Sequence, residues 1–104
     1  MVNESYFEAA MDHFRTKHPH VVFLVVSDDM EWCREHLNSK DTFHIGGTSP
    51  EVDMAIMANC NGSIIDYGTF GLWGAVMSGG EVVVTTQTFR DVRWAAEYLG
   101  WTFV

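Results

Sequence analysis

An unbroken run of apolar, mostly β-branched residues extends from Val21 to Val26 near the start of the chain. Such residues favour strands, and a strand that is apolar on both of its faces has to be covered on both. That environment exists in the middle of a parallel sheet with helices on each side. The run therefore predicts a parallel α/β architecture.

Helix-like and strand-like segments alternate along the rest of the chain. Apolar residues recur at helical spacing at about residues 5–17, 30–37, 50–57, 69–77 and 91–98, and shorter strand-like segments lie at 42–45, 63–67 and 81–86. Alternation of this kind produces right-handed crossovers between parallel strands. We therefore expect one α/β domain with a mostly parallel sheet of about four strands and helices on both faces.

Charge and composition exclude several functions. The net charge of −8 repels phosphate backbones, so nucleic acid is not an expected partner. The N-terminus has neither a basic region nor an apolar stretch, and the longest apolar run is too short to cross a bilayer, so neither a signal peptide nor membrane contact by this segment is expected. The histidines lack metal-binding spacing, and no metal site is predicted. Cys33 and Cys60 are either two buried thiols or one disulfide.

The segment Gly68-Thr69-Phe70-Gly71 lies between a predicted strand and a predicted helix. The start of a helix offers unpaired N–H groups and a positive dipole end, which suits a phosphate group. The glycines would let the main chain approach a ligand closely, and Thr69 would add a hydroxyl donor. Alternatively, Thr69 only caps the helix and the glycines only form the turn.

Carboxylates follow two other predicted strands. Ser27, Asp28 and Asp29 come directly after the apolar run, where acidic side chains can hold Mg²⁺ or a ribose, or can cap the next helix. Asp53 lies in the first turn of the third predicted helix, a position that by itself indicates an interaction with the helix dipole. Ligands of parallel sheets bind at the carboxyl ends of the strands, so the loops at these ends are the expected site.

Two asparagines, Asn3 and Asn61, each stand two residues before a serine in the N-glycosylation pattern. Both are therefore candidate glycosylation sites. The pattern is short and arises by chance, so it gives only weak support to a setting in the lumen of the secretory pathway.

A recognisable series of segments runs through the chain. It consists of Tyr6-Phe7-x-x-Ala10-Met11-x-x-Phe14, Phe23 to Val26, Met30-Glu31-Trp32-Cys33-Arg34-Glu35, Asp53-Met54-Ala55, Cys60-Asn61, Gly68-Thr69-Phe70-Gly71-x-Trp73-Gly74-Ala75 and Ser78-Gly79-Gly80-Glu81. Together these segments resemble the C-terminal region of the animal galactoside α1,2-fucosyltransferases, from about Ser5 to about Thr86.

The resemblance implies an enzyme. Members of that family are inverting transferases that move L-fucose from GDP-fucose to the 2-hydroxyl of a terminal galactose on a glycan, without a required metal or other cofactor. Their fold is of the GT-B kind, with two Rossmann-like lobes, and this chain would be most of the C-terminal, donor-binding lobe. The resemblance also implies the Golgi lumen as the location, with an N-terminal membrane anchor in full-length members that this segment does not contain.

The family's H-x-R-R-x-D motif lies upstream of the point that matches Met1, and its arginine neutralises the pyrophosphate of the leaving GDP. We therefore expect residues 1–104 to be a single incomplete domain, without that motif, the acceptor lobe and the sheet's first strand, and to be inactive alone. A developing pyrophosphate charge needs a cation or fixed donors. The basic residues nearest the expected loops are Lys40 and Arg90, neither on a matched motif.

The resemblance assigns donor-binding roles but no catalytic residue. It implies that a helix carboxylate accepts hydrogen bonds from the paired N–H donors of guanine, which adenine lacks. It implies that the glycine turn holds the pyrophosphate and that the neighbouring strand end lines the nucleotide site. The residues at these places are Asp53 for guanine, Gly68, Thr69 and Phe70 for the pyrophosphate, and Ser27 and Asp28 for the lining.

Other classes of protein remain open. The length of the chain also fits a stand-alone Rossmann-like module that binds a nucleotide or a partner without catalysis, or a degenerate fragment with no ligand. A receiver-like signalling domain fits poorly, because Asp66 is imperfectly placed for a phosphoacceptor and the required lysine near the last strands is missing.

Overall fold

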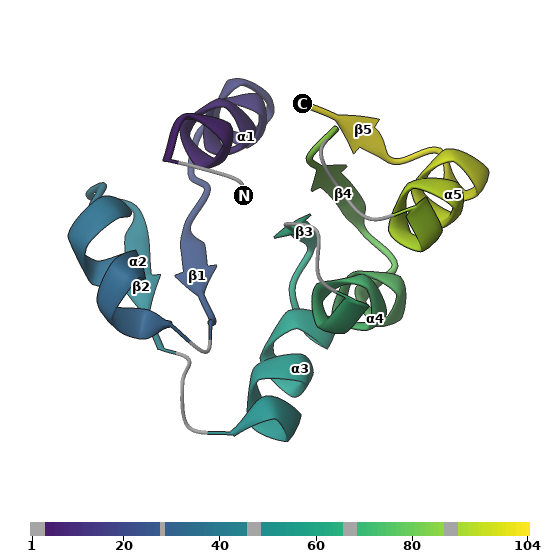
Figure 1. Cartoon of the computed structure of the whole chain (residues 1–104). Helices are drawn as coiled ribbons and strands as arrows, with labels where there is room; N and C mark the ends of the chain where they lie inside the picture. Colours follow the sequence, from purple (N-terminus) through teal and green to yellow (C-terminus); the bar gives the residue numbers. More distant parts are fainter. Residues whose placement is uncertain (1–3, 28, 46–48, 66–68, 87–89) are drawn as a thin grey trace.

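The computed structural model describes residues 4–27, 29–45, 49–65, 69–86 and 90–104. For residues 69–72 and 90–91 it describes the main chain alone. Helices and strands alternate along these residues (Figure 1). The helices are α1 (Glu4–Lys17), α2 (Met30–His36), α3 (Pro50–Ala58), α4 (Thr69–Ser78) and α5 (Arg90–Leu99). The strands are β1 (Phe23–Val25), β2 (Thr42–His44), β3 (Gly62–Ile65), β4 (Glu81–Val84) and β5 (Thr102–Phe103).

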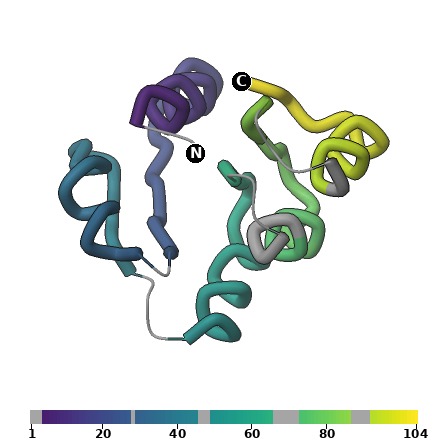
Figure 2. Tube along the Cα trace, in the orientation of Figure 1, coloured from purple at the N-terminus to yellow at the C-terminus, as the bar shows by residue number. Residues whose placement is uncertain are grey.

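All strand pairs of the described residues are parallel, which confirms the predicted α/β class. The prediction of one sheet with about four strands is not confirmed, because the strands form two sheets, β1-β2 and β3-β4-β5. Figure 2 shows the first sheet in the purple and blue half of the trace and the second in the teal to yellow half. The physical reason is that β1 and β3 are not hydrogen-bonded to each other. Each is therefore an edge strand of its own sheet.

Local signals in the sequence set the ends of the helices. The side chain of Asp29 caps α2 by accepting a hydrogen bond from the N–H of Trp32, at 3.2 Å, so Asp29 rather than Ser27 is the cap. Ser49 caps α3 in the same way through the N–H of Val52, at 3.2 Å, with a proline at the first helical position. Such caps satisfy N–H groups that the helix itself leaves unpaired.

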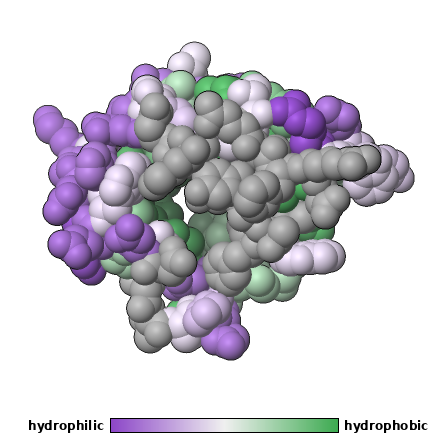
Figure 3. Space-filling model, in the orientation of Figure 1, coloured by the Kyte–Doolittle hydropathy of each residue, from purple (hydrophilic) through white to green (hydrophobic). Residues whose placement is uncertain are grey.

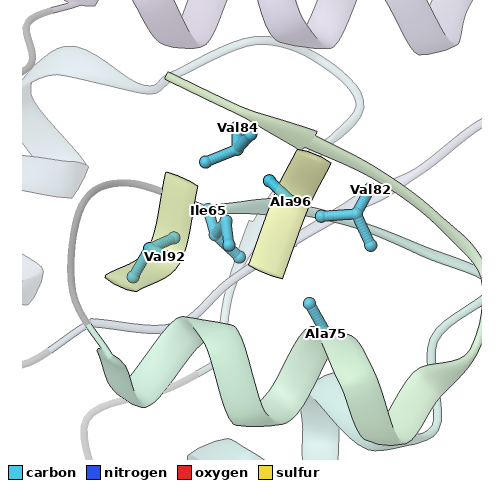
Figure 4. Packing of buried hydrophobic residues seen from close by; sticks show 6 residues of the cluster. All are labelled: Ile65, Ala75, Val82, Val84, Val92 and Ala96. Atoms are coloured by element: carbon cyan, nitrogen blue, oxygen red, sulfur yellow. The ribbon is translucent and has the colours of Figure 1, made fainter. Parts of the chain in front are cut away.

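One hydrophobic cluster fills the space between the sheet β3-β4-β5 and two helices on one of its faces. Figure 4 shows the alanine of α4 and the two residues of α5 directed toward the strand side chains. Residues this deeply buried make up the core, and their small or β-branched side chains let helix and sheet approach closely. The members of this cluster are Ile65, Ala75, Val82, Val84, Val92 and Ala96.

The opposite face is covered by α1, which contacts both sheets. Its buried residues Tyr6, Ala10 and Phe14 pack against Val83 of β4 and also against a set of half-buried neighbours. That set includes residues of β1 and of β3: Phe7, Val21, Phe23 and Ile64. The hydroxyl of Tyr6 donates to the main-chain carbonyls of Ile65 and Val83, so the edge of this cluster is hydrogen-bonded as well as apolar.

Ion pairs fasten the C-terminal half of α1 to both sheets. Arg15 donates two parallel hydrogen bonds to Asp41, which directly precedes β2, both at 2.9 Å. On the other side, Lys17 and His13 contact Glu81, the first residue of β4, at 2.8 and 2.7 Å. The guanidinium of Arg15 lowers the pKa of Asp41, and hydrogen bonds from Lys17 and His13 lower the pKa of Glu81. Both carboxylates are thereby held in their charged form.

None of the helices in the described part of the chain is long and apolar enough to cross a membrane.

Candidate functional site

The strands of the two sheets run in the same direction, and their contacts with α1 show this. Near its start, the ring of Phe7 lies 6.0 Å from that of Trp32, in the helix that follows the carboxyl end of β1. Tyr6 on the same turn bonds to Ile65, the last residue of β3. The start of α1 is therefore next to the carboxyl ends of both strands.

The other end of α1 lies over the amino ends of the same strands. The ring of Phe14 is 6.5 Å from that of Phe23, the first residue of β1. Phe14 also packs so tightly on Gly62, the first residue of β3, that a Cβ atom there would come within 2.9 Å of the ring. Since α1 runs antiparallel to both strands, their carboxyl ends lie on one side of the molecule. We call this side the carboxyl edge.

Four helices of the described chain begin at the carboxyl edge, because α2, α3, α4 and α5 follow the carboxyl ends of β1, β2, β3 and β4. Each helix start carries unpaired N–H groups and the positive end of a dipole. At the first of them, the hydroxyl of Ser27 accepts a hydrogen bond from the N–H of Asp29, at 3.0 Å. Ser27 thus shapes the turn into α2, while Asp28 lies outside the described residues.

Asp53 lies in the first turn of α3, as the sequence predicts, and only 6% of it is exposed. Glu51 in the same turn is exposed, and an exposed carboxylate is sufficient to interact with the helix dipole. Removing a carboxylate from water is costly, so a buried carboxylate is normally held by hydrogen bonds or ion pairs. Its burial therefore distinguishes Asp53 from an exposed carboxylate in the first turn of a helix, such as Glu51.

The start of α4 lies on the same side as that of α3. Met57 of α3 packs against Gly74 of α4, where a Cβ atom would lie 2.9 Å from the methionine side chain. The C-terminal ends of both helices meet at Asn61, whose carbonyl packs directly against Gly80. The two helices therefore run side by side away from the carboxyl edge. Their first turns, which contain Asp53 and Thr69, open toward that edge.

The predicted glycine turn is described only in part. Thr69 and Phe70 are the first two residues of α4, the helix that follows β3, which confirms that this segment leads from a strand into a helix. Gly68 lies outside the described residues. The structure thus places the main chain of Thr69 and Phe70 at a helix start.

A cation that the sequence reasoning missed lies at the carboxyl edge. Arg93 of α5 donates a hydrogen bond to the carbonyl of Thr86, which follows β4, and its guanidinium lies 5.3 Å from the centre of the Phe103 ring. Lys40, by contrast, precedes β2 and lies on the opposite side. The sequence did contain a signal for Arg93. It lies three residues after Arg90 in a predicted helix that follows a strand, so the two arginines lie on the same face of that helix.

The candidate glycosylation site Asn61 lies away from this edge. Asn61 is exposed at the amino end of β3, whereas Ser63 of the same sequon is buried and its hydroxyl has no partner among the described atoms. Asn3 lies outside the described residues.

Cys33 and Cys60 are free thiols rather than one disulfide, and burial raises the pKa of Cys60. Within the described residues, no group of three or more His, Cys, Asp or Glu side chains is placed to hold a metal ion.

The fold and its carboxyl edge define a parallel α/β protein with helix starts grouped at the place where such proteins bind ligands. Residues 1–102 match the family "Glycosyl transferase family 11", and the chain belongs to this family. The resemblance found in the sequence segments is therefore confirmed.

Named relatives are similar over most of this chain. One is "Galactoside alpha-(1,2)-fucosyltransferase 1" of Saimiri sciureus, 42% identical over 88 residues, which are 80% of this chain and 24% of the relative. Another is "Galactoside 2-alpha-L-fucosyltransferase SEC1" of Bos taurus, 39% identical over 88 residues, with the same coverage. The chain thus spans about a quarter of the length of these relatives. No solved structure matches it.

Proposed function

We propose that this chain is the donor-binding part of a galactoside 2-α-L-fucosyltransferase and that its carboxyl edge binds the nucleotide of GDP-fucose. Membership of glycosyltransferase family 11 and two relatives named as fucosyltransferases support the proposal. The full-length enzyme would transfer fucose to the 2-hydroxyl of a terminal galactose in the Golgi lumen. The acceptor would bind to a second lobe, in a fold of the GT-B kind.

The observation that carries the proposal is a buried carboxylate among grouped helix starts. Asp53 is an anion of α3, and the neighbouring start of α4 offers main-chain N–H groups to another anion. One ligand suits both features when it carries two adjacent N–H donors at one end and phosphates at the other. Guanosine diphosphate has that pattern, while adenosine diphosphate lacks the donor pair.

The proposal assigns a role to each candidate residue. Asp53 accepts two hydrogen bonds from guanine, and Gly68, Thr69 and Phe70 hold the pyrophosphate through main-chain N–H groups and the threonine hydroxyl. Ser27 and Asp28 line the nucleotide site from the neighbouring strand. No metal ion or other cofactor takes part, and residues 1–104 alone transfer no fucose, because the motif with the pyrophosphate-binding arginine is supplied from elsewhere in the enzyme.

Calorimetry with GDP and ADP tests the proposal, with Asp53→Asn as the main variant. The change keeps the shape of the side chain but places a donor where guanine also donates. A charge-assisted hydrogen bond is worth about 1.5–3 kcal/mol, so GDP affinity should fall roughly ten- to a hundredfold, with little change for ADP. Thr69→Ala should weaken GDP less, because the main-chain donors remain.

Glu51→Gln is the matched control. It lies in the same turn and carries the same charge but is exposed, so it should leave the preference for GDP intact. Thermal unfolding of each variant separates loss of binding from loss of fold. Equal affinity of the parent chain for GDP and ADP, or an Asp53→Asn variant that keeps its GDP affinity, would remove the assignment.

A further inference from the structure

The outer surface of α4 is apolar. The sequence of this helix contains no charged residue, and Trp73 and Met77, one turn apart, are both exposed. Helices at the surface of a soluble protein normally carry charged residues on the side that faces water. An uncharged helix with an exposed tryptophan therefore indicates a surface that binds something.

The neighbouring helix α5 adds two aromatic rings. Trp94 and Tyr98 are 68% and 78% exposed, and their rings stack with the centres 5.7 Å apart. Ala96 of α5 and Ala75 of α4 belong to one buried cluster, so both helices cover the same face of the sheet β3-β4-β5 (Figure 1). By helical spacing, the two rings lie on the side of α5 opposite Ala96, which faces away from the sheet.

An open hollow of about 330 Å³ joins the outer surfaces of the two helices. Val76 of α4 and Leu99 of α5 line it, and both are also exposed. The lining includes Gly79 and Gly100, which directly follow the two helices, and Glu81, the first residue of β4. The hollow therefore lies at the amino ends of the strands, on the side opposite the carboxyl edge.

The exposed side chains around this hollow form one surface, which we call the aromatic face. Their exposed fractions range from 42% to 78%. With about 150–250 Å² for a whole aromatic side chain, these fractions amount to roughly 500 Å² of mostly apolar surface. Patches of that size are among the largest on monomeric proteins and are often functional. The members of the aromatic face are Trp73, Val76, Met77, Trp94, Tyr98 and Leu99.

We propose that the aromatic face binds the same face of a second copy of this chain, in a dimer with two-fold symmetry. Each copy carries both parts of a self-complementary contact, which are the protruding pair Trp94 and Tyr98 and the hollow beside it. A two-fold rotation places the pair of each copy in the hollow of the other. A hollow of this volume has room for an aromatic side chain.

Area and composition support a second copy as the partner. A standard interface buries about 800 Å² per partner, with an apolar centre and a polar rim. The aromatic face is large enough to be such a centre. Tryptophan, tyrosine and methionine are enriched in the centres of interfaces and charged residues are depleted there, as they are on this face.

The distribution of charge selects the same surface. Two copies with a net charge of −8 each repel one another. Figure 3 shows strongly hydrophilic residues over α2 at the left and pale or green residues over α4 at the lower right. Among the described side chains of α5, Glu97 is the exposed acidic one. Contact through the aromatic face thus keeps most of the charges apart, and we expect a dissociation constant on the order of 10 µM.

A second lobe of the enzyme suits the aromatic face less well than a second copy does. Under the proposed function, that lobe has to face the nucleotide at the carboxyl edge. The hollow lies at the opposite ends of α4 and α5, so the lobe can cover the edge and leave the hollow free. This comparison depends on the proposed function, whereas the dimer follows from the aromatic face itself.

Sedimentation equilibrium of the 104-residue chain tests the proposal, and Trp94→Ser and Tyr98→Ser are the main variants. Losing a central aromatic residue typically weakens an interface at least about tenfold, and a two-fold dimer contains the change twice. Each variant should therefore raise the dissociation constant about a hundredfold. Phe43→Ser is the matched control, because Phe43 is 50% exposed but lies in β2, away from both helices, and it should leave the dimer unchanged.

Val76→Phe distinguishes a specific contact from general adhesion of apolar surfaces. The change makes the aromatic face more apolar but fills the hollow, so it should weaken the dimer at least about tenfold. Added salt screens the repulsion between the acidic copies, so the dimer of the parent chain should become severalfold tighter between about 50 mM and about 500 mM salt.

Several results would overturn the proposal. They are a parent chain that stays monomeric up to about 500 µM, a dimer that Phe43→Ser breaks, a Val76→Phe dimer as tight as that of the parent, and a dimer that salt weakens. Binding of a monomeric chain to phosphatidylcholine vesicles would assign the face to a membrane instead. Thermal unfolding confirms that each variant is folded. GDP takes no part, so failure of the dimer leaves the nucleotide assignment untouched.

Discussion

Replacing Gly80 by alanine tests the packing that directs α3 and α4 toward the carboxyl edge. A Cβ atom at this position would overlap the carbonyl oxygen of Asn61 and lie 2.6 Å from its carbonyl carbon and 3.2 Å from the nitrogen of Gly62. All three atoms belong to the main chain, so no side chain can rotate away. The entry to β3 or the end of α4 has to move instead.

The adjacent Gly79 is the matched control. Its φ of 70° lies in the left-handed region, but a Cβ atom there would meet nothing within 4 Å. Alanine at 79 should cost about 1 kcal/mol of unfolding free energy for the backbone conformation alone. Alanine at 80 should cost about 3 kcal/mol, the upper part of the range for overpacking, because rigid main chain has to shift.

Thermal and urea unfolding of the two variants measure the difference. For a domain of this size, about 1 kcal/mol corresponds to roughly 4–8 °C, so Gly80→Ala should lower the midpoint by at least roughly 10 °C and Gly79→Ala by much less. Equal losses for the two variants, or a larger loss for Gly79→Ala, would show that Gly80 does not pack closely against Asn61.

Two further predictions concern the attachment of α1. The pKa values of Asp41 and Glu81 are lowered in the folded chain, so the folded chain binds fewer protons than the unfolded chain. The two carboxylates therefore contribute fully to the free energy of unfolding at a pH above the usual carboxyl range. This contribution is lost as the pH falls below about 4. Urea unfolding between about pH 6 and pH 3 should show this loss, and Asp41→Asn should reduce it; an unchanged pH dependence would contradict the role of the pair with Arg15. Tyr6→Phe keeps the buried ring but removes the donor to Ile65, so it should lower the unfolding free energy by about 1 kcal/mol, and a variant as stable as the parent would argue against that bond.

Features encoded by a few adjacent residues could be predicted from the sequence. The starts of α2 and α3 and the end of α4 depend on capping side chains and on Gly79 in the left-handed region, and such signals act within one turn. The placement of Asp53 in a first turn and of Thr69 at a helix start follows from the same local rules. Each of these predictions is confirmed by the structure.

Features that depend on contacts between distant parts of the chain could not be predicted from the sequence. The predicted strand 21–26 is only Phe23–Val25, since a strand with an open side has fewer hydrogen bonds to extend it. The short β5 exists because β4 offers a second side for pairing. Neither the burial of Asp53 nor the position of Arg93 against Thr86 is visible in the local sequence, because both depend on packing between separate elements.

The attachment of α1 also determines the order in which the chain can fold as it is synthesised. Its bonds to Glu81 and Val83 join residues 64 to 77 positions apart. At about 5–20 residues per second, a ribosome needs roughly 3 to 15 s to reach β4 after α1 is complete. During that interval α1 can dock only on the first sheet, so half of its buried face stays in water. The second sheet is therefore the last part of the molecule to close.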